Sequence, residues 1–225
     1  MRAARRLSIL ATTGLISLLG AAAGASAAGA STSMTQIANL FWIVAILAVG
    51  IGVFVGIVLV ATVLKFRVRR GHTAPNPKLA SSNHTLEAAW TIVPAVILLV
   101  LGVLAFETLT FTDTVPQHYD VQVTAIGHQW FWEFWVNYTG NGTDIHYPVG
   151  ALTLISNQTV LLVVKSVDVD HSLFIPALGV HLDAIPGHVN QIWFKPDMPG
   201  QYVVVCTQFC GQGHYAMDAT LTVVR

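Results

Sequence analysis

Residues 201–223 read QYVVVCTQFCGQGHYAMDATLTV, and they hold both cysteines of this 225-residue chain. The alternation of apolar and polar residues predicts strands over Gln201–Val205 and Ala219–Val223. Four side chains with soft donor atoms lie in or beside the intervening loop: Cys206, Cys210, His214 and Met217. A loop held at both ends by strands is a common location for functional residues. Thiolate, imidazole and thioether donors suit copper far better than calcium or magnesium.

The rest of the C-terminal half repeats this strand-like character. Val121–Ala125 alternates apolar and polar residues, and Leu161–Val164 is a short apolar run. Turn signals at Pro186-Gly187 and Pro199-Gly200 separate such segments. Short strands at regular spacing with these turns predict a β-sandwich or barrel. The stretch from residue 112 to 225 is long enough to bury one core, so we expect one domain there.

The N-terminal half is too apolar for a soluble protein. The whole chain is 54% hydrophobic and 10% charged, whereas soluble domains carry about a quarter charged residues. The first apolar run follows Arg2, Arg5 and Arg6, is short, and ends in the A-x-A pattern Ala25-Ser-Ala27. A basic start, an apolar middle and an A-x-A site predict a secretory signal peptide over residues 1–27.

Two longer apolar runs predict transmembrane helices over residues 37–64 and 87–110, because each is long enough to cross a hydrocarbon core. Residues 28–36 are then an exported N-terminal segment. The connecting residues 65–86 are basic, and short basic loops stay on the cytoplasmic side. Both ends of the mature chain are therefore expected outside. These features predict a bacterial-type inner (plasma) membrane location, with the C-terminal domain on the periplasmic side.

The expected exported domain is acidic. From residue 112 onward the chain has nine Asp and Glu residues against three Lys and Arg residues, although the whole chain has no net charge. Nucleic acid is therefore not expected as a partner. A basic protein would be steered toward such a surface.

The residues alone leave several interpretations of the cysteine loop open. Exported cysteines usually form disulfides, but a bridge between Cys206 and Cys210 would close a tiny loop and constrain little. His171 lies just after the strand that begins at Leu161 and could supply a second imidazole. A blue-copper site would leave one cysteine unused, and a zinc site of two Cys and two His would leave Met217 without a role. Two thiolates bridging two copper ions would use every donor.

The spacing C-x3-C-x3-H-x2-M resembles that of subunit II of the haem–copper cytochrome c oxidases. Three more stretches carry the resemblance: Asp168-Val-Asp-His-Ser172, Gly127-His-Gln-Trp-Phe-Trp132 and Glu87-Ala-Ala-Trp-Thr-Ile-Val-Pro94. The resemblance implies two membrane helices and an all-β cupredoxin-like Greek-key barrel that holds the binuclear CuA centre. It implies that Cys206 and Cys210 bridge the two coppers. It also implies the remaining ligands: His171 and Met217 on one ion, and His214 and the Gln208 carbonyl on the other.

The same resemblance implies a role in an aa3-type oxidase. Electrons from cytochrome c would enter at Trp130 and pass to haem in subunit I, where oxygen is reduced to water with proton translocation. Glu87 would lie at the mouth of a proton channel. Subunit III and membrane lipid are further expected partners. The family commonly has Glu at the position of Gln208, and an amide binds magnesium more weakly than a carboxylate, so magnesium at the boundary with subunit I stays open.

Three alternatives differ in what they would need. A quinol oxidase subunit has no use for the copper ligands, and nitrous oxide reductase needs a large additional domain. A membrane-anchored copper carrier or storage protein is the alternative from another functional class. It would bind exchangeable copper and would need neither Trp130 nor Glu87.

Overall fold

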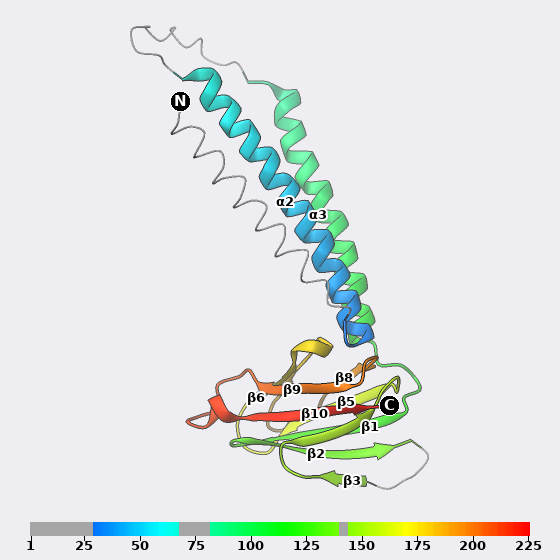
Figure 1. The fold of residues 1–225 in the computed structure, drawn as a ribbon. Helices are drawn as coiled ribbons and strands as arrows, with labels where there is room; N and C mark the ends of the chain where they lie inside the picture. The colour runs from blue at the N-terminus through cyan, green and yellow to red at the C-terminus, as the bar shows by residue number, and fades with distance from the viewer. Residues whose placement is uncertain (1–28, 68–81, 140–143) are drawn as a thin grey trace, which may run out of the picture. The chain divides into compact units, whose positions relative to one another are not determined.

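The computed structural model describes residues 29–67, 82–139 and 144–225 (Figure 1). The expected signal peptide, residues 1–27, lies outside these ranges, as do residues 68–81 of the expected cytoplasmic loop. The α-helices are α2 (Thr32–Phe66) and α3 (His84–Asp113), and the 3-10 helices are η1 (Pro176–Leu178) and η2 (His214–Ala216). The strands are β1 (Val121–His128), β2 (Phe131–Tyr138), β3 (Asp144–Tyr147), β4 (Ala151–Ile155), β5 (Val160–Ser166), β6 (His171–Ile175), β7 (Val180–Ala184), β8 (Asn190–Phe194), β9 (Gly200–Cys206) and β10 (Asp218–Val224).

The strands form two five-stranded sheets, ordered β3-β2-β1-β5-β8 and β4-β10-β9-β6-β7, which pack face to face (Figure 1). The pairs β1–β5 and β4–β10 are parallel, and the other pairs are antiparallel. Neighbours within a sheet are therefore often distant in sequence, as in a Greek key. The predicted fold class, two apolar helices with a cupredoxin-like β-domain, is confirmed.

Alternate residues of the strands fill the space between the sheets, because successive side chains of a strand point to opposite faces. In β1 the buried side chains are Val121, Val123 and Ala125. In β2 they include Trp132 and Phe134, two of the largest fully buried side chains among the described residues. Full burial of one such apolar side chain contributes about 1.5–3 kcal/mol. The packing of this core makes the ends of the strands around the cysteines rigid.

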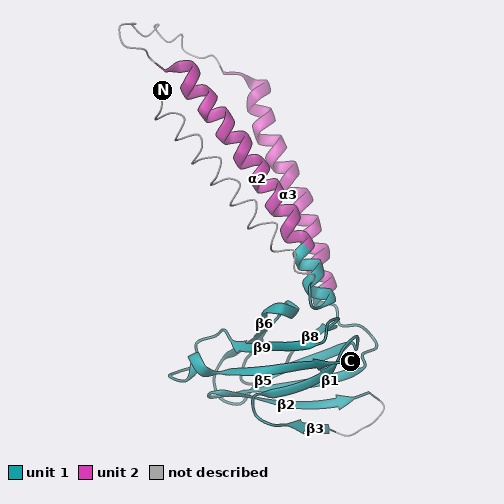
Figure 2. Ribbon diagram, in the orientation of Figure 1, with its two compact units in different colours: residues 1–38, 112–225 teal, residues 39–111 magenta. Residues whose placement is uncertain are grey.

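The segment before α2 is tied to the β-domain. The Asp197 amide donates to the Ala30 carbonyl at 2.9 Å, and the buried Ser31 hydroxyl donates to the Leu178 carbonyl at 2.5 Å. Ser31 Oγ also accepts from the Met34 amide at 3.0 Å, which makes Ser31 the N-cap of α2. One compact unit accordingly combines the described residues of the range 112–225 with residues 29–38 (Figure 2).

The second unit, residues 39–111, holds most of α2 and α3 (Figure 2). Both helices are long and apolar enough to cross a membrane. Large apolar side chains lie exposed along them, including Ile46 at 70% and Leu98 at 69%. A helix that is apolar on all sides needs either a protein or a lipid environment. The structure thus has two helices of the kind predicted for the membrane anchor.

Candidate metal centre

The cysteine loop is closed by the β9–β10 hairpin. The two strands pair in antiparallel register, with Asp218 opposite Val205. Just beyond the pair, the Cys206 amide donates to the Met217 carbonyl at 3.1 Å. The hairpin therefore brings both ends of residues 206–217 together, and we call these residues the donor loop. Its last turn, η2, begins at His214.

His171 reaches the donor loop by strand pairing. It is the first residue of β6, which pairs with β9 so that Leu173 lies opposite Cys206. The Thr207 amide extends this contact by donating to the Ser172 carbonyl at 2.9 Å. The His171 side chain has no solvent exposure, and its Nδ1 lies 3.9 Å from Cys206 Sγ. A histidine 35 residues upstream is thereby held beside the first cysteine.

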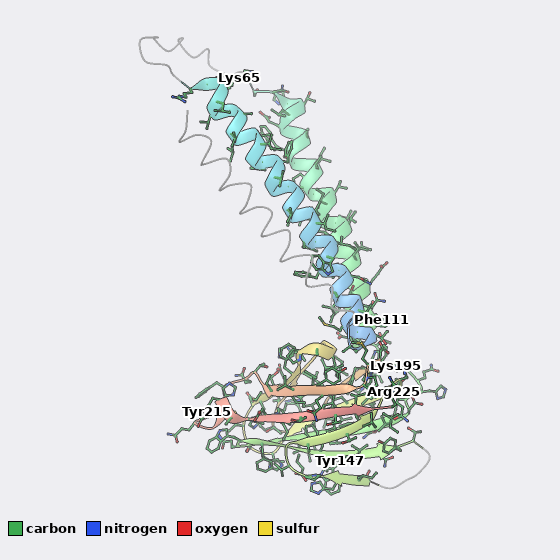
Figure 3. The ribbon with its side chains drawn as sticks, viewed as in Figure 1. Lys65, Phe111, Tyr147, Lys195, Tyr215 and Arg225 are labelled. Carbon is green, nitrogen blue, oxygen red and sulfur yellow. The ribbon has the colours of Figure 1, made fainter. Side chains whose placement is uncertain are left out.

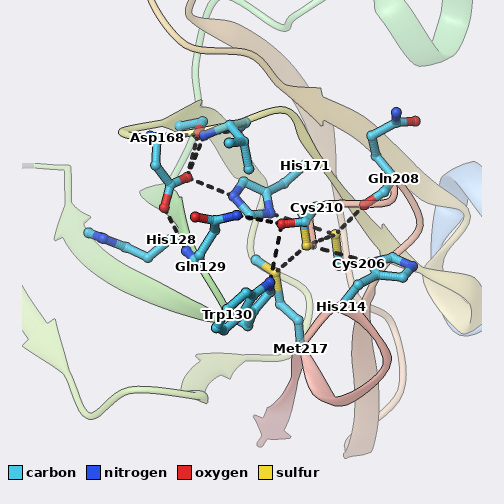
Figure 4. Close-up of polar contacts among 12 residues, drawn as sticks. His128, Gln129, Trp130, Asp168, His171, Cys206, Gln208, Cys210, His214 and Met217 are labelled. Carbon is cyan, nitrogen blue, oxygen red and sulfur yellow. Dashed lines mark hydrogen bonds and ion pairs between the residues drawn. The ribbon is translucent and has the colours of Figure 1, made fainter. Parts of the chain in front are cut away.

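The sulfur, nitrogen and oxygen donors named from the sequence converge at one point (Figure 4). The two Sγ atoms are 3.9 Å apart and the cysteines are not bonded to each other. Cys210 Sγ lies 3.6 Å from His214 Nδ1 and 3.7 Å from Met217 Sδ. The Gln208 carbonyl oxygen lies 3.3 Å from Cys206 Sγ. Two thiols, two imidazoles, a thioether and a carbonyl form a soft donor set that fits copper.

Burial affects the protonation of this site. Desolvation raises the pKa of the Cys210 thiol to about 11, and the neighbouring Cys206 adds to the increase. Metals bind the thiolate form of cysteine. Occupation by a cation therefore releases the Cys210 proton, and it requires an ion with a strong preference for sulfur.

A carboxylate orients His171 from the opposite side. Asp168 Oδ1 lies 2.9 Å from His171 Nε2, which leaves Nδ1 facing the cysteine sulfurs. Burial disfavours the charged form of Asp168, but hydrogen bonds from His171 and from the Val169 and Gln129 amides outweigh it and lower the pKa to about 2. A histidine that ligates a metal usually donates its other N–H to such a partner. The geometry therefore leaves Nδ1 as the His171 ring atom available to a metal ion.

Trp130 lies against the donor loop. Its indole Nε1 donates to the Cys210 carbonyl at 3.1 Å, and its side chain is 40% exposed. The adjacent Gln129 donates through Nε2 to the same carbonyl at 2.6 Å (Figure 4). Trp130, which the resemblance names as the entry point for electrons, is thus in contact with both solvent and the Cys210 main chain.

The other residues named from the sequence lie elsewhere. Glu87 is on the first turn of α3 in the second unit, where its carboxylate is 3.4 Å from His84 Nδ1. The Gln208 side chain is exposed, so only its carbonyl belongs to the cluster. Tyr215 belongs to the donor loop but was given no role from the sequence; its side chain is 90% exposed and points away from the sandwich (Figure 3).

Two site residues were not singled out by sequence reasoning. Asp168 was noted only as part of a motif, and Gln129 only as one member of an aromatic run. The available signals were weak: an acid three residues before a candidate histidine, and a single amide among aromatics. Both contacts span long sequence separations, 39 residues for Gln129–Asp168 and 81 for Gln129–Cys210.

Two family models match the chain. Residues 144–224 match the cytochrome c oxidase subunit II periplasmic domain, and residues 24–108 match the cytochrome c oxidase subunit II transmembrane domain. Together these two segments cover most of the chain, including the donor loop, His171 and both apolar helices.

Individual relatives carry the same description. Cytochrome c oxidase subunit 2 of Cereibacter sphaeroides is 30% identical over 228 residues, covering 87% of this chain and 74% of the relative. A probable cytochrome c oxidase subunit 2 of Rickettsia bellii is 28% identical, covering 79% of this chain and 71% of the relative. The crystal structure of the periplasmic domain of subunit II of cytochrome oxidase (CoxB) of Bradyrhizobium japonicum is 31% identical. It covers 49% of this chain and 88% of that one, with a TM-score of 0.44.

Proposed function

Because this chain belongs to the cytochrome c oxidase subunit II family, and so to a haem–copper oxidase complex, we propose that it carries electrons from cytochrome c to haem in subunit I of an aa3-type oxidase. The observation that carries the proposal is the pair of thiols 3.9 Å apart, surrounded by two imidazole nitrogens, a thioether and a carbonyl. A bound pair of copper ions would supply a one-electron acceptor whose charge is shared across the two sulfurs.

The residues divide the work of holding such a centre. In this proposal Cys206 and Cys210 would supply thiolates shared by both ions. His171 and Met217 would be the further ligands of one ion, and His214 with the Gln208 carbonyl those of the other. The chain supplies rigidity, because these donors lie on paired strands and a closed hairpin. Rigid ligands change little between oxidation states, which favours fast electron transfer.

Trp130 is the proposed point at which electrons enter. Its partial exposure supports contact with a protein donor, and its hydrogen bond to the Cys210 carbonyl supports a path inward. The excess of acidic residues in the β-domain would attract a basic cytochrome c.

The remaining parts of the proposal concern the membrane. We place the chain in a bacterial-type inner membrane, with the β-domain in the periplasm and with subunit III and lipid as further neighbours. Glu87, in the first turn of α3, is the proposed mouth of a proton path that continues in subunit I, since ionisable groups on membrane helices often serve proton transfer. A magnesium ion at the boundary with subunit I would meet the neutral amide of Gln208, which is a weaker ligand than a carboxylate.

Copper loading of the full chain in detergent tests the proposal. The full chain is needed because Ala30, Ser31 and Ser33 are buried in the same unit as the β-domain. We expect two coppers per chain and an electron paramagnetic resonance signal split by both nuclei. The Cys206→Ser variant should lose this signal. One localised, exchangeable copper would favour a carrier, and a preference for zinc would remove the electron-transfer function.

Stopped-flow mixing with reduced cytochrome c tests the role of Trp130. Trp130→Ala should slow electron uptake while the copper signal is unchanged. If Trp130→Ala instead abolishes copper binding, Trp130 is a packing residue and its assignment is wrong.

A further inference from the structure

We propose that Gln129, Gly211 and Gly213 are positioning residues that hold the Trp130 indole against the donor loop. The inference rests on the proposed function, in which electrons enter at Trp130. It extends that function by assigning the orientation of the indole to two supports, a clamp formed by Gln129 and a surface formed by the two glycines.

Gln129 forms the clamp because it is bonded at both its main chain and its side chain. Its Nε2 donates to the Cys210 carbonyl at 2.6 Å, the same oxygen that accepts from Trp130 Nε1 at 3.1 Å. Its amide donates to Asp168 Oδ2 at 2.7 Å. A carbonyl oxygen has two lone pairs, so Gln129 and Trp130 together satisfy the acceptor on Cys210. Gln129 is therefore held at both its main chain and its side chain, next to the indole of the residue that follows it.

The two glycines form the surface on which the indole lies. A Cβ added at Gly213 would be 2.4 Å from Trp130 Cδ2 and 2.6 Å from Trp130 Cγ. A Cβ added at Gly211 would be 3.1 Å from Trp130 Nε1, and the φ of +121° at Gly211 is one that other residues rarely adopt. Any side chain at position 213 would push the ring away from the loop backbone, so close approach requires glycine there.

The close contact with the glycine surface keeps the path for electrons between the Trp130 indole and the Cys210 sulfur short. From Trp130 Nε1 the route crosses one hydrogen bond to the Cys210 carbonyl and then follows covalent bonds through Cα and Cβ to Sγ. One electron would move inward along it with no bond made or broken. Loss of the hydrogen bond would leave only a through-space gap. The rate should therefore depend on the residues that keep the indole in place.

The first test needs no copper. In the metal-free full chain in nanodiscs, the indole N–H resonance of Trp130 can be assigned by its absence from Trp130→Phe. Gln129→Ala and the isosteric Gln129→Glu, whose carboxylate does not donate to a carbonyl, should shift this resonance and speed its solvent exchange by about 10-fold or more. Gln122→Ala is the matched control, because Gln122 lies on β1, the strand that ends just before Gln129, and its side chain contacts Tyr119. An unchanged Trp130 resonance in both Gln129 variants would overturn the proposal.

The second test measures electron uptake from reduced cytochrome c in the copper-loaded chain. Gln129→Ala should slow uptake by about 10-fold, within the ~10²-fold that a 1 Å misplacement can cost, with the copper resonance signal unchanged. In a Trp130→Phe background the same substitution should add nothing, because both changes break one connection. Additive losses would show that Gln129 acts elsewhere and would refute the clamp.

Gly213→Ala checks the glycine surface independently. It should displace the indole resonance and slow uptake to a similar extent, whereas Gly200→Ala should change neither, since a Cβ there would meet neighbours only at 3.6 Å or more. If Trp130→Phe leaves uptake unchanged, the proposed use of Trp130 fails. If Trp130→Phe slows uptake but the Gln129 and Gly213 variants do not, only the present inference fails.

Discussion

Two clusters in the described part of the β-domain each contain a carboxylate that is hydrogen-bonded to histidine. The clusters differ in what surrounds the imidazole rings. Asp168 lies 2.9 Å from His171, while Glu133 lies 3.0 Å from His128 and 3.1 Å from His146. The carboxylate–imidazole distances are thus nearly equal. A hydrogen bond between these two groups is therefore not, without further context, a sign of a metal site.

The second nitrogen and the burial of each ring make the difference. His171 is fully buried, and its Nδ1 faces Cys206 Sγ. His128 stacks on Phe131 with ring centres 4.6 Å apart, and His146 packs on Trp135 at 4.5 Å. Both of these histidines are partly exposed. The first cluster presents a nitrogen to soft donors, and the second anchors rings on the outer face of a sheet.

The largest contrast should come from removing one histidine of each cluster. His171→Ala should lower copper affinity by more than about 100-fold, because the cysteine sulfurs lose an imidazole donor that strand pairing holds beside them. His146→Ala should leave the affinity unchanged. Titration of the full chain against a copper chelator of known affinity measures both. Equal losses in the two variants would place the metal outside the donor loop.

A smaller contrast is expected for the carboxylates. Asp168→Asn keeps the size of the side chain but removes the charge that orients His171, so copper affinity should fall by about 10–100-fold. Glu133→Gln makes the same chemical change in the other cluster and should have no effect on copper. The same chelator titration applies. An intact affinity in Asp168→Asn would mean that His171 is oriented by packing alone.

The smallest effect concerns acid stability of the second cluster. Burial opposes the charge of Glu133, but hydrogen bonds from Trp135 and His128 outweigh it and lower the pKa below its ordinary 4.5. The stabilisation is therefore fully present above about pH 4.5 and is lost as the pH falls through the lower folded-state pKa. The free energy of unfolding of wild type should exceed that of Glu133→Gln by about 0.5–1 kcal/mol near pH 7, and the two should converge as the pH is lowered below 4.5 and through the folded-state pKa of Glu133.

Thermal unfolding of the metal-free chain in detergent, followed by tryptophan fluorescence across this range, measures the convergence. A gap that widens toward low pH would contradict the sign of the Glu133 shift. Copper affinity of Glu133→Gln at neutral pH serves as the control, because it should match wild type.

Strands were predictable where one face meets the core and the other meets water. Val121–Ala125 and Ala219–Val223 alternate in this way and lie within β1 and β10. Strand β6, which carries His171, was not predicted. Four of its five residues are buried, so it shows no alternation. Strand β3 is exposed along most of its length and also lacks the pattern.

The donor loop was predictable because its side chains are close in sequence and share a chemical character. Its supporting contacts were not. Gln129 and Cys210 are 81 residues apart, and no local pattern links an amide in an aromatic run to a distant carbonyl. Such contacts depend on the order of strands in each sheet, which places β1 and β9 in different sheets whose ends meet at the loop.

The order of residues along the chain was enough to name the candidate donor atoms and to identify the two apolar helices and the family, because side-chain chemistry and hydrophobic patterning are local properties. Folding in three dimensions was needed to bring His171, which the sequence had already named, beside the cysteines. Pairing of β6 with β9 buries His171 beside Cys206, whereas His128 and His146 face outward. It was needed equally to place Trp130 against Gly211 and Gly213, which follow it by 81 and 83 residues, since that contact exists only where two sheets bring their ends together.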